Sequence, residues 1–135
     1  MPSISSTENL LADLSDRQRE AVTHTDGPLL IVAGPGSGKT RVMAHRVAYL
    51  VGDKGVPPWK ILAVTFTNKA ARELRERCER LVGVGSNELQ VRTFHGFCSR
   101  VLRTDGEKVG LKPEFTIYDA DDQARVARRI LNDFD

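Results

Sequence analysis

The sequence predicts an α/β fold in which a parallel sheet is flanked by helices. Three short apolar runs indicate buried strands, and each is followed by a longer segment with apolar residues at helical spacing. The runs lie at residues 29–32, 61–64 and 89–93. Strands separated by helical connections of this length pair in parallel through right-handed crossovers. Binding residues are therefore expected near the carboxyl ends of the strands.

One glycine-rich loop indicates the chemistry. The segment AGPGSGKT, residues 33–40, joins the first apolar run to an amphipathic segment, with the small residue Ala33 at its first position. Its three glycines let the backbone curl until successive N–H groups point at one spot, and they keep Cβ atoms away from bound oxygens. Lys39 adds a positive charge for terminal phosphates, Thr40 offers a hydroxyl to magnesium, and the next helix directs its positive end at the same anion. The loop predicts binding of a nucleoside triphosphate.

Length and composition limit the classes to consider. The chain has 135 residues, a mass of 15.0 kDa and 40% hydrophobic residues, so we expect one domain at most, with a modest core. It has no apolar run long enough for a membrane span and no signal-peptide pattern at its N-terminus, so a cytoplasmic protein without a membrane partner is expected. Cys78 and Cys98 lack the spacing of a zinc site or a disulfide framework, and both are predicted to be small core residues.

Charge is unevenly distributed although the formal net charge is only +2. Residues 32–59 carry four bases and one acid, and residues 60–103 carry nine bases and four acids. The segments on either side, 1–31 and 104–135, are acidic. The first basic surplus suits a nucleotide, and the second suggests a polyanion bound nearby.

A short helix before the loop carries a residue with two alternative roles. Residues 1–13 are expected to form a mobile lead-in, and a helix is predicted from Asp16 to about His24. Ser15 and Gln18 have the spacing of a capping box, which would account for Gln18 structurally. Alternatively, the Gln18 amide, which can donate and accept, reads the edge of an adenine. The spacing favours neither role.

Polar and aromatic residues follow the second and third predicted strands, a mixture that suits single-stranded nucleic acid. Phe66 either stacks on a base or belongs to the core, and His95 either binds a phosphate or is structural. Helical periodicity also makes Phe94 a core residue, and Thr67 or Asn68 is expected to cap the next helix. The two clusters comprise Thr65, Phe66, Thr67, Asn68 and Lys69 after the second strand, and Thr93, Phe94 and His95 after the third.

The helix predicted at residues 69–82 has one apolar stripe, and Gly83 is placed to end it. The stripe consists of Ala70, Ala71, Leu74, Cys78, Leu81 and Val82. The outer face of the helix presents arginine and glutamate. Glu73 with Arg77, and Glu76 with Arg80, have the i, i+4 order that favours ion pairs. We therefore interpret this face as a solvated lattice of ion pairs instead of a binding surface.

The C-terminal part is predicted to contain a polar linker at residues 106–113, a short extended segment at 115–118 and a last helix that buries Val126, Ile130 and Leu131. The acidic cluster that begins at Asp119 could be mistaken for the magnesium-binding strand end of phosphate-loop enzymes. Such a strand is central and apolar throughout, whereas Thr116 interrupts this one. Asp119 is therefore interpreted as a helix N-cap.

Five segments together resemble the opening of superfamily 1 DNA helicases of the UvrD, PcrA and Rep kind. They are LSDRQREAV, AGPGSGKTR, AVTFTNKAARELRERC, VRTFHGFCSRVLR and FTIYDADDQ, in order from about Leu14 to the last residue. The resemblance implies a RecA-like P-loop NTPase fold, ATP and Mg²⁺ as cofactors, and 3′ to 5′ unwinding of DNA in replication or repair. It implies that Gln18 reads adenine and that Arg41 lies close to the nucleotide. It also implies that residues 65–69 and 93–95 lie along single-stranded DNA.

By the same resemblance Lys39 and Thr40 are catalytic, and Thr40 is the magnesium ligand. The nucleotide-binding set is Gln18, Ala33, Gly34, Pro35, Gly36, Ser37, Gly38, Lys39, Thr40 and Arg41. The family's acidic magnesium motif, arginine fingers and second motor domain have no counterpart in the chain, so we expect weak nucleotide binding without hydrolysis. Residues 14–110 are interpreted as the first part of motor domain 1A, and residues 111–135 as the start of a helical segment. An incomplete sheet exposes an edge, which predicts self-association.

Two alternatives stay open. Small nucleotide kinases also carry GPGSGKT after an N-terminal strand, but they need an arginine-rich lid and an acceptor pocket, which the sequence does not show. A natural short non-enzymatic protein that binds DNA or nucleotide could instead use the loop for structure alone.

Overall fold

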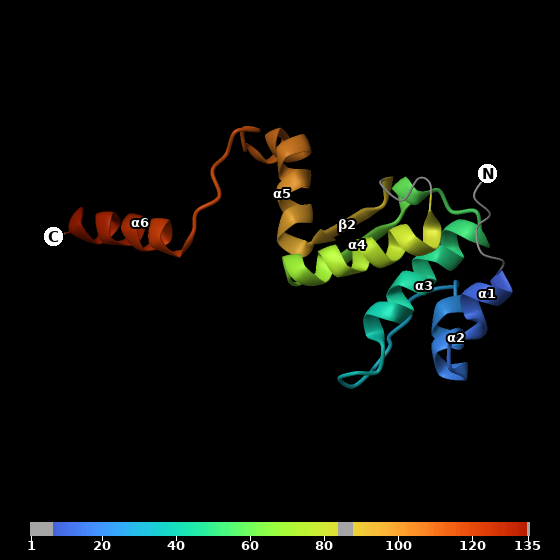
Figure 1. The fold of residues 1–135 in the computed structure, drawn as a ribbon. Coiled ribbons are helices and arrows are strands. Elements are labelled where there is room, and N and C mark those ends of the chain that lie inside the picture. Colours follow the sequence, from blue (N-terminus) through green and yellow to red (C-terminus); the bar gives the residue numbers. More distant parts are fainter. Residues whose placement is uncertain (1–6, 84–87, 135) are drawn as a thin grey trace. The chain divides into compact units, whose positions relative to one another are not determined.

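The computed structural model describes residues 7–83 and 88–134 of the chain. By internal contacts the chain divides into two compact units, Met1–Phe97 and Cys98–Asp135. The described elements, shown in Figure 1, are α1 (Thr7–Ala12), α2 (Asp16–Thr23), α3 (Lys39–Gly52), the 3₁₀ turn η1 (Pro58–Lys60), β1 (Leu62–Thr65), α4 (Asn68–Val82), β2 (Gln90–Thr93), α5 (Phe94–Asp105), the 3₁₀ turn η3 (Gly106–Val109) and α6 (Ala120–Asn132). The predicted α/β class is confirmed at this level.

The sheet of the first unit consists, in the described residues, of β1 and β2 in parallel. Ala63 lies opposite Val91, and Thr65 lies opposite Thr93. The crossover between the strands contains α4, which packs on both of them, and α3 lies between α4 and the α1–α2 pair (Figure 1). The carboxyl ends of both strands therefore meet at one edge of the sheet.

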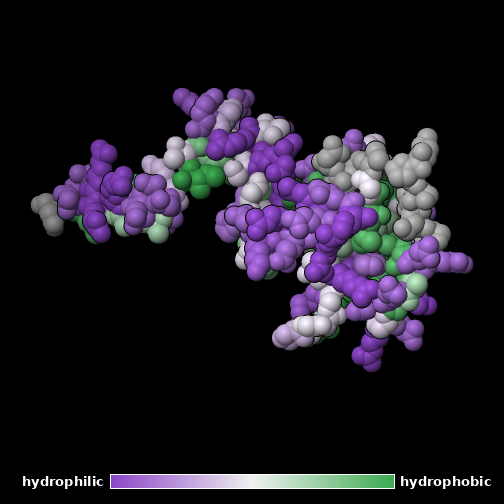
Figure 2. All heavy atoms as spheres, viewed as in Figure 1, coloured by the Kyte–Doolittle hydropathy of each residue, from purple (hydrophilic) through white to green (hydrophobic). Residues whose placement is uncertain are grey.

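The core of this unit is formed mainly by α3, α4 and the strands. The predicted apolar stripe of α4 is confirmed, and Gly83 ends the helix with a positive φ of 73°. Figure 2 shows hydrophilic residues over the outward side of α4. The buried residues of the cluster are Leu10, Leu14, Ala21, Val22, Val42, Ala44, Val47, Ala48, Tyr49, Ala63, Leu74, Cys78, Val82, Leu89 and Val91.

The strand predicted at residues 29–32 is not formed. In the described part of the chain these residues have no partner strand, and Leu30 and Val32 are 87% and 91% exposed. The parallel pair forms instead between the second and third apolar runs. Strand propensity reflects packing on a half-buried surface, and a run without a neighbouring strand lacks both that surface and its hydrogen-bond partners.

The lead-in predicted at residues 1–13 is also corrected. Thr7–Ala12 form α1, and Leu10 is buried in the core beside Leu14. The burial of these two leucines orders a polar stretch that has little helical periodicity of its own. Residues 1–6 lie outside the described residues.

Several predicted core positions are exposed. Cys98 is exposed, Phe94 is 43% exposed, and Val126, Ile130 and Leu131 of α6 are exposed as well. An amphipathic stripe shows which face of a helix can be buried, but a neighbouring element must cover it before burial occurs. Neither α5 nor α6 has a buried residue.

The ion-pair lattice predicted on α4 is not observed. The ion pairs found among the described residues involve Arg41, Lys108 and Arg125, and none joins two residues of α4. An exposed pair gains little Coulomb energy and loses side-chain entropy, so favourable spacing alone does not hold it together. Arg75 instead donates from Nη2 to the Val91 carbonyl at 2.5 Å.

The second unit confirms the cap at Asp119. Its carboxylate accepts a hydrogen bond from the Asp122 backbone at 2.9 Å, and the Asp122 side chain accepts one from the Asp119 backbone in return. Residues 106–109 of the predicted linker form η3. Arg103 donates to the Pro113 carbonyl at 2.7 Å, and its guanidinium lies 4.6 Å from the Phe115 ring centroid.

Candidate functional site

The glycine-rich loop forms the turn that its sequence predicts. Residues 35–37 turn, and the Ser37 N–H donates to the Gly34 carbonyl at 3.4 Å. Gly36 and Gly38 have φ values of 72° and 82°, in the left-handed region where side chains are strained. A Cβ on Gly38 would lie 3.1 Å from Gln18 Nε2. Gly38 is therefore required both by its backbone conformation and by the approach of α2.

Lys39 and Thr40 begin α3 directly after this turn. The Lys39 ammonium donates to the carbonyls of Gly34 at 2.7 Å and Ala33 at 3.2 Å, so it lies along the inside of the loop. The Ser37 hydroxyl donates to the same Gly34 carbonyl at 2.7 Å. The helix directs the partial positive charge of its first turn toward the loop, which favours an anion there.

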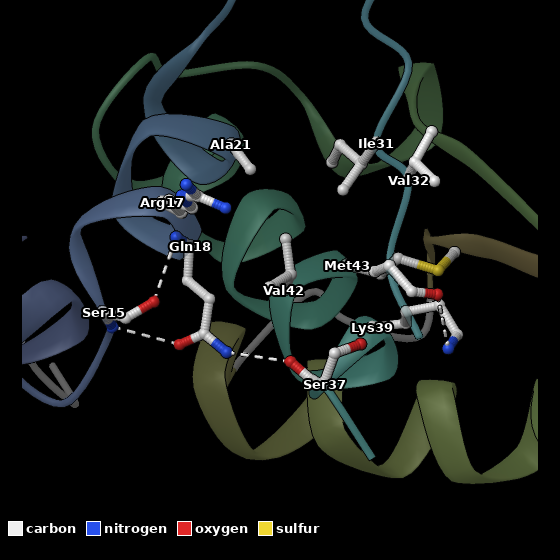
Figure 3. Close-up of a pocket in the computed structure, with 11 residues that line it drawn as sticks. Ser15, Arg17, Gln18, Ala21, Ile31, Val32, Ser37, Lys39, Val42 and Met43 are labelled. Atoms are coloured by element: carbon white, nitrogen blue, oxygen red, sulfur yellow. Dashed lines mark hydrogen bonds between the residues drawn. The ribbon is translucent and has the colours of Figure 1, made fainter. Parts of the chain in front are cut away.

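Gln18 forms the predicted capping box and also contacts the glycine-rich loop. Its Oε1 accepts from the Ser15 N–H at 3.1 Å, which completes the predicted capping box of α2. Its Nε2 donates to the Ser37 carbonyl at 3.0 Å, as Figure 3 shows. An amide oxygen has two lone pairs and an amide nitrogen two hydrogens, so one acceptor and one donor remain. The cap therefore orients the amide without using up its hydrogen-bonding capacity.

A cavity of about 420 Å³ lies between α2 and this loop. Apolar side chains form much of its wall, including Ile31, Val32 and Met43 at one side of the close-up in Figure 3. The full lining is Ser15, Arg17, Gln18, Ala21, Ile31, Val32, Ala33, Ser37, Lys39, Val42 and Met43. The apolar wall residues were missed by motif reasoning, because they belong to no motif and become neighbours only when α2 packs on α3.

The sequence motifs also did not reveal the contact of Arg46 with the end of α2. Its Nη1 donates to the Ala21 carbonyl at 2.9 Å and also to the His24 carbonyl. These carbonyls belong to the C-terminal end of α2, where helix carbonyls lack partners within the helix. The partners lie more than twenty positions from Arg46 in sequence, so no local spacing signals the contact.

The predicted nucleic-acid residues meet where β1 and β2 end. The rings of Phe66 and Phe94 lie with their centroids 5.1 Å apart, tilted by 43°. Phe66 is 86% exposed, which rules out the core alternative for it. The Thr67 hydroxyl accepts from the Ala70 N–H at 3.1 Å, so Thr67 caps α4, and Asn68 begins it.

The other residues of this edge are polar and accessible. Thr65 and Thr93 face each other in register, and the Thr93 hydroxyl accepts from the Gly96 N–H at 3.1 Å. Asn68, Lys69 and His95 are exposed. The fold thus gathers the predicted nucleic-acid residues into one group, the strand-end group: Thr65, Phe66, Thr67, Asn68, Lys69, Thr93, Phe94 and His95. None of them lines the cavity at the glycine-rich loop.

The sequence matches the family model of the UvrD/REP helicase N-terminal domain over residues 14–135. The chain belongs to this family. The resemblance based on the five sequence segments is therefore confirmed, and the glycine-rich loop described above lies within the matched residues.

Relatives of this UvrD/REP domain carry the name ATP-dependent DNA helicase PcrA. The chain is 51% identical to the Bacillus subtilis protein over 127 residues, which make up 94% of this chain and 17% of that protein. It is 52% identical to the Leuconostoc citreum protein over 129 residues, or 95% of this chain and 17% of that protein. A Staphylococcus aureus protein is 51% identical over 122 residues, again 17% of its length. The chain thus spans only a small part of these relatives.

Two further findings concern partners. Of the helices in the described residues, none is both long and apolar enough to cross a membrane. No group of three or more histidine, cysteine, aspartate or glutamate side chains that could hold a metal ion occurs within residues 7–83 and 88–134.

Proposed function

We propose that this chain is the N-terminal, ATP-binding and single-stranded-DNA-contacting part of an ATP-dependent 3′ to 5′ DNA helicase that acts in replication or repair. The proposal includes a RecA-like P-loop fold for residues 14–110 as part of motor domain 1A, and a following helical segment at 111–135. It also includes action in the cytoplasm, where DNA and ATP are available to such an enzyme. Support comes from the family membership and from the names of the relatives.

The observation that carries the nucleotide part is the bond from Gln18 to the P-loop at Ser37, beside an apolar cavity. A site for ATP needs an apolar surface for the base, a hydrogen-bonding group for its edge, and a positive cradle for the phosphates. In this proposal the cavity wall supplies the apolar surface, and Gln18 supplies the hydrogen-bonding group. The glycine-rich turn and Lys39 supply the positive cradle. We assign the base to the wall that contains Ile31 and Met43.

The remaining donor and acceptor of Gln18 suit adenine in this proposal. The adenine edge presents N7 as an acceptor and the 6-amino group as a donor, whereas guanine presents two acceptors at N7 and O6. An amide with one free N–H and one free lone pair satisfies adenine at both atoms and guanine at only one. Gln18 would therefore favour ATP over GTP.

At the phosphate end, backbone N–H groups of the loop and Lys39 would hold the phosphates, and Arg41 would lie close by. The glycine cradle fits this role because side chains at Gly36 and Gly38 would be strained. Thr40 would be the protein ligand of Mg²⁺, which typically keeps several waters and binds phosphate oxygens for its other ligands. The bound metal would neutralise charge between the terminal phosphates.

The nucleotide part is tested by direct binding of a fluorescent ATP analogue. Lys39→Ala should weaken binding at least about tenfold, because a charge-assisted contact to phosphate is lost. Lys60→Ala, an exposed lysine outside the cavity, serves as the matched control and should leave affinity unchanged. Equal affinity of wild type and Lys39→Ala would support the non-enzymatic alternative, and phosphoryl transfer to a nucleoside monophosphate in a coupled assay would support the kinase alternative.

The DNA part rests on the exposed Phe66 ring beside Phe94. Aromatic faces stack with bases of any sequence at about 1–3 kcal/mol per base, and the surrounding hydroxyls, amide and lysine can bind phosphates. Phe66→Ala should weaken binding of a dye-labelled oligo-dT roughly 5- to 100-fold in fluorescence anisotropy. Trp59→Ala removes another exposed aromatic ring and should have no effect. Equal losses in both variants would contradict a specific role for Phe66.

Hydrolysis is not expected from these 135 residues. Phosphoryl transfer depends on positioning and on charge stabilisation of the transition state, which in this family comes from groups outside the chain. Steady ATPase activity stimulated by single-stranded DNA would refute this part of the proposal.

A further inference from the structure

A second concave surface lies between α3 and α4, and the roles proposed above do not account for its residues His45, Arg77 and Arg80. This groove has a volume of about 260 Å³. Its lining is Arg41, Ala44, His45, Arg77, Arg80 and Leu81. It shares no lining residue with the cavity at the P-loop, so the two are separate sites. Both lie within the first unit.

The groove is lined by three guanidinium groups and an imidazole, without a carboxylate. Among the described residues Arg77 and Arg80 form no ion pair, because Glu73 and Glu76 do not come within 4.0 Å of them. Arg41 lies 3.9 Å from Asp13, whose side chain is 88% exposed and therefore well screened. Like charges around one concavity repel each other, and an anion in the groove would relieve that repulsion.

The donor chemistry of the groove suits a phosphate group. Each guanidinium presents several N–H donors in a planar fork that matches phosphate oxygens. His45 Nδ1 is 2.8 Å from the Arg41 carbonyl, so Nδ1 carries the hydrogen, and Nε2 of the neutral ring is an acceptor that can pair with a protonated phosphate oxygen. Ala44 is buried and Leu81 is half-buried, so the floor of the groove is apolar and screens charge less than bulk water does.

A purely structural account explains only part of this arrangement. Arg80 lies in the last turn of α4, where a cation offsets the negative end of the helix dipole. The helix dipole does not explain why Arg41 and His45 of α3 face the same groove. It also does not explain why Arg77 lines the groove. The dipole therefore leaves the meeting of cations from two helices unexplained.

We propose that the groove between α3 and α4 binds one phosphate group, with Arg77 and Arg80 as its principal donors and Arg41 and His45 completing the site. The phosphate comes either from a small molecule, such as inorganic phosphate or pyrophosphate, or from the backbone of single-stranded nucleic acid. The site shares Arg41 with the nucleotide site proposed above, but its principal donors Arg77 and Arg80 have no role there, and it explains part of the basic surplus at residues 60–103.

The test uses the full chain carrying Lys39→Ala, so that the P-loop contributes little to phosphate binding. In that background Arg77→Gln combined with Arg80→Gln removes two cations but keeps their stems. Arg72→Gln is the matched control, since Arg72 is exposed on the same helix and does not line the groove. Inorganic pyrophosphate is titrated by calorimetry, and a dye-labelled oligo-dT is titrated by anisotropy.

The double variant should bind at least one probe about tenfold or more weakly than the Arg72→Gln control. A loss for pyrophosphate identifies a small phosphate ligand, and a loss for oligo-dT alone identifies a backbone phosphate. Equal binding by the double variant and the control, for both probes, would overturn the proposal. If circular dichroism shows that the double variant is misfolded, the single variants Arg77→Gln and Arg80→Gln decide by the same comparison. Because Lys39 is already removed, these outcomes do not depend on whether the P-loop binds ATP.

Discussion

The Gln18 side-chain nitrogen donates to the Ser37 carbonyl at 3.0 Å, so α2 is hydrogen-bonded directly to the P-loop. The same amide accepts from the Ser15 backbone, which ties its orientation to the start of α2. A residue that caps its own helix is thereby held in the wall of the cavity beside the glycine-rich loop. The capping bond and the P-loop bond together determine which end of the amide faces which partner.

Gln18→Met should abolish the preference for adenine. Methionine keeps an unbranched side chain but cannot accept from the adenine 6-amino group, the contact that guanine lacks, and it cannot donate to Ser37 or to N7. The Ser15 hydroxyl still caps α2 at the Gln18 N–H. We expect the ratio of ATP to GTP affinity, measured by competition with a fluorescent ATP analogue, to fall about tenfold toward unity. Glu20→Gln changes a charge on the same helix outside the cavity and should preserve the ratio. An unchanged ratio in Gln18→Met would show that the Gln18 amide does not read the base.

Arg46→Met should loosen α2 from α3. The variant keeps the apolar stem and loses the donors to the Ala21 and His24 carbonyls, at a cost of roughly 2 kcal/mol in the free energy of unfolding. Amide hydrogen exchange should accelerate in α2 more than in α4. Arg72→Met alters an exposed arginine and should change neither the exchange pattern nor the urea midpoint. Uniform acceleration throughout the first unit would point to general destabilisation instead of a local clamp.

Cys78 should make stability fall at alkaline pH. Burial, with a smaller effect from the Glu79 charge, raises the pKa of Cys78 from 9.0 to about 11. The folded state therefore holds the thiol proton more tightly than the unfolded state. The contribution of Cys78 to the free energy of unfolding is constant below about pH 9. It is lost as pH rises toward 11, by roughly 2 to 3 kcal/mol in all. The free energy of unfolding, measured with urea at several pH values, should fall more steeply above pH 9 in the single variant Cys98→Ser, which keeps Cys78. It should fall less steeply in the double variant Cys78→Ala with Cys98→Ser.

Thiol labelling gives an independent check on the two cysteines. Exposed Cys98 should react with a disulfide reagent at once, whereas buried Cys78 should react only after unfolding. Equal labelling rates at neutral pH would contradict the burial of Cys78.

Self-association should depend on the unpaired apolar run. Leu30 and Val32 are 87% and 91% exposed, and exposed apolar runs promote contacts between chains. Light scattering should show an apparent mass that rises with concentration, and Leu30→Ser with Val32→Ser should suppress the rise. Trp59→Ser replaces an exposed apolar residue elsewhere and should not suppress it. A wild-type monomer at every concentration would refute the prediction.

Features that depend on spacings of a few residues were readable from the sequence. The P-loop turn, the capping boxes at Ser15 and Asp119, and the apolar stripe of α4 all arise from contacts within one or two turns of the chain. Their energetics are local, so residue type and spacing are sufficient to predict them. The parallel direction of the strands also followed from the length of the helical crossover, but the pair forms between residues 62–65 and 90–93 and does not include residues 29–32.

Contacts between distant segments were settled by packing alone. The sequence could not show that residues 29–32 stay unpaired, that the Phe66 ring is exposed, or that Arg46 binds the end of α2. Each of these depends on which surfaces other elements cover, so it is determined by contacts between residues far apart in the chain. Local propensity and spacing do not encode such contacts. For the same reason, the spacing of charges on α4 did not show that its ion pairs are absent or that its arginines form a basic groove with α3.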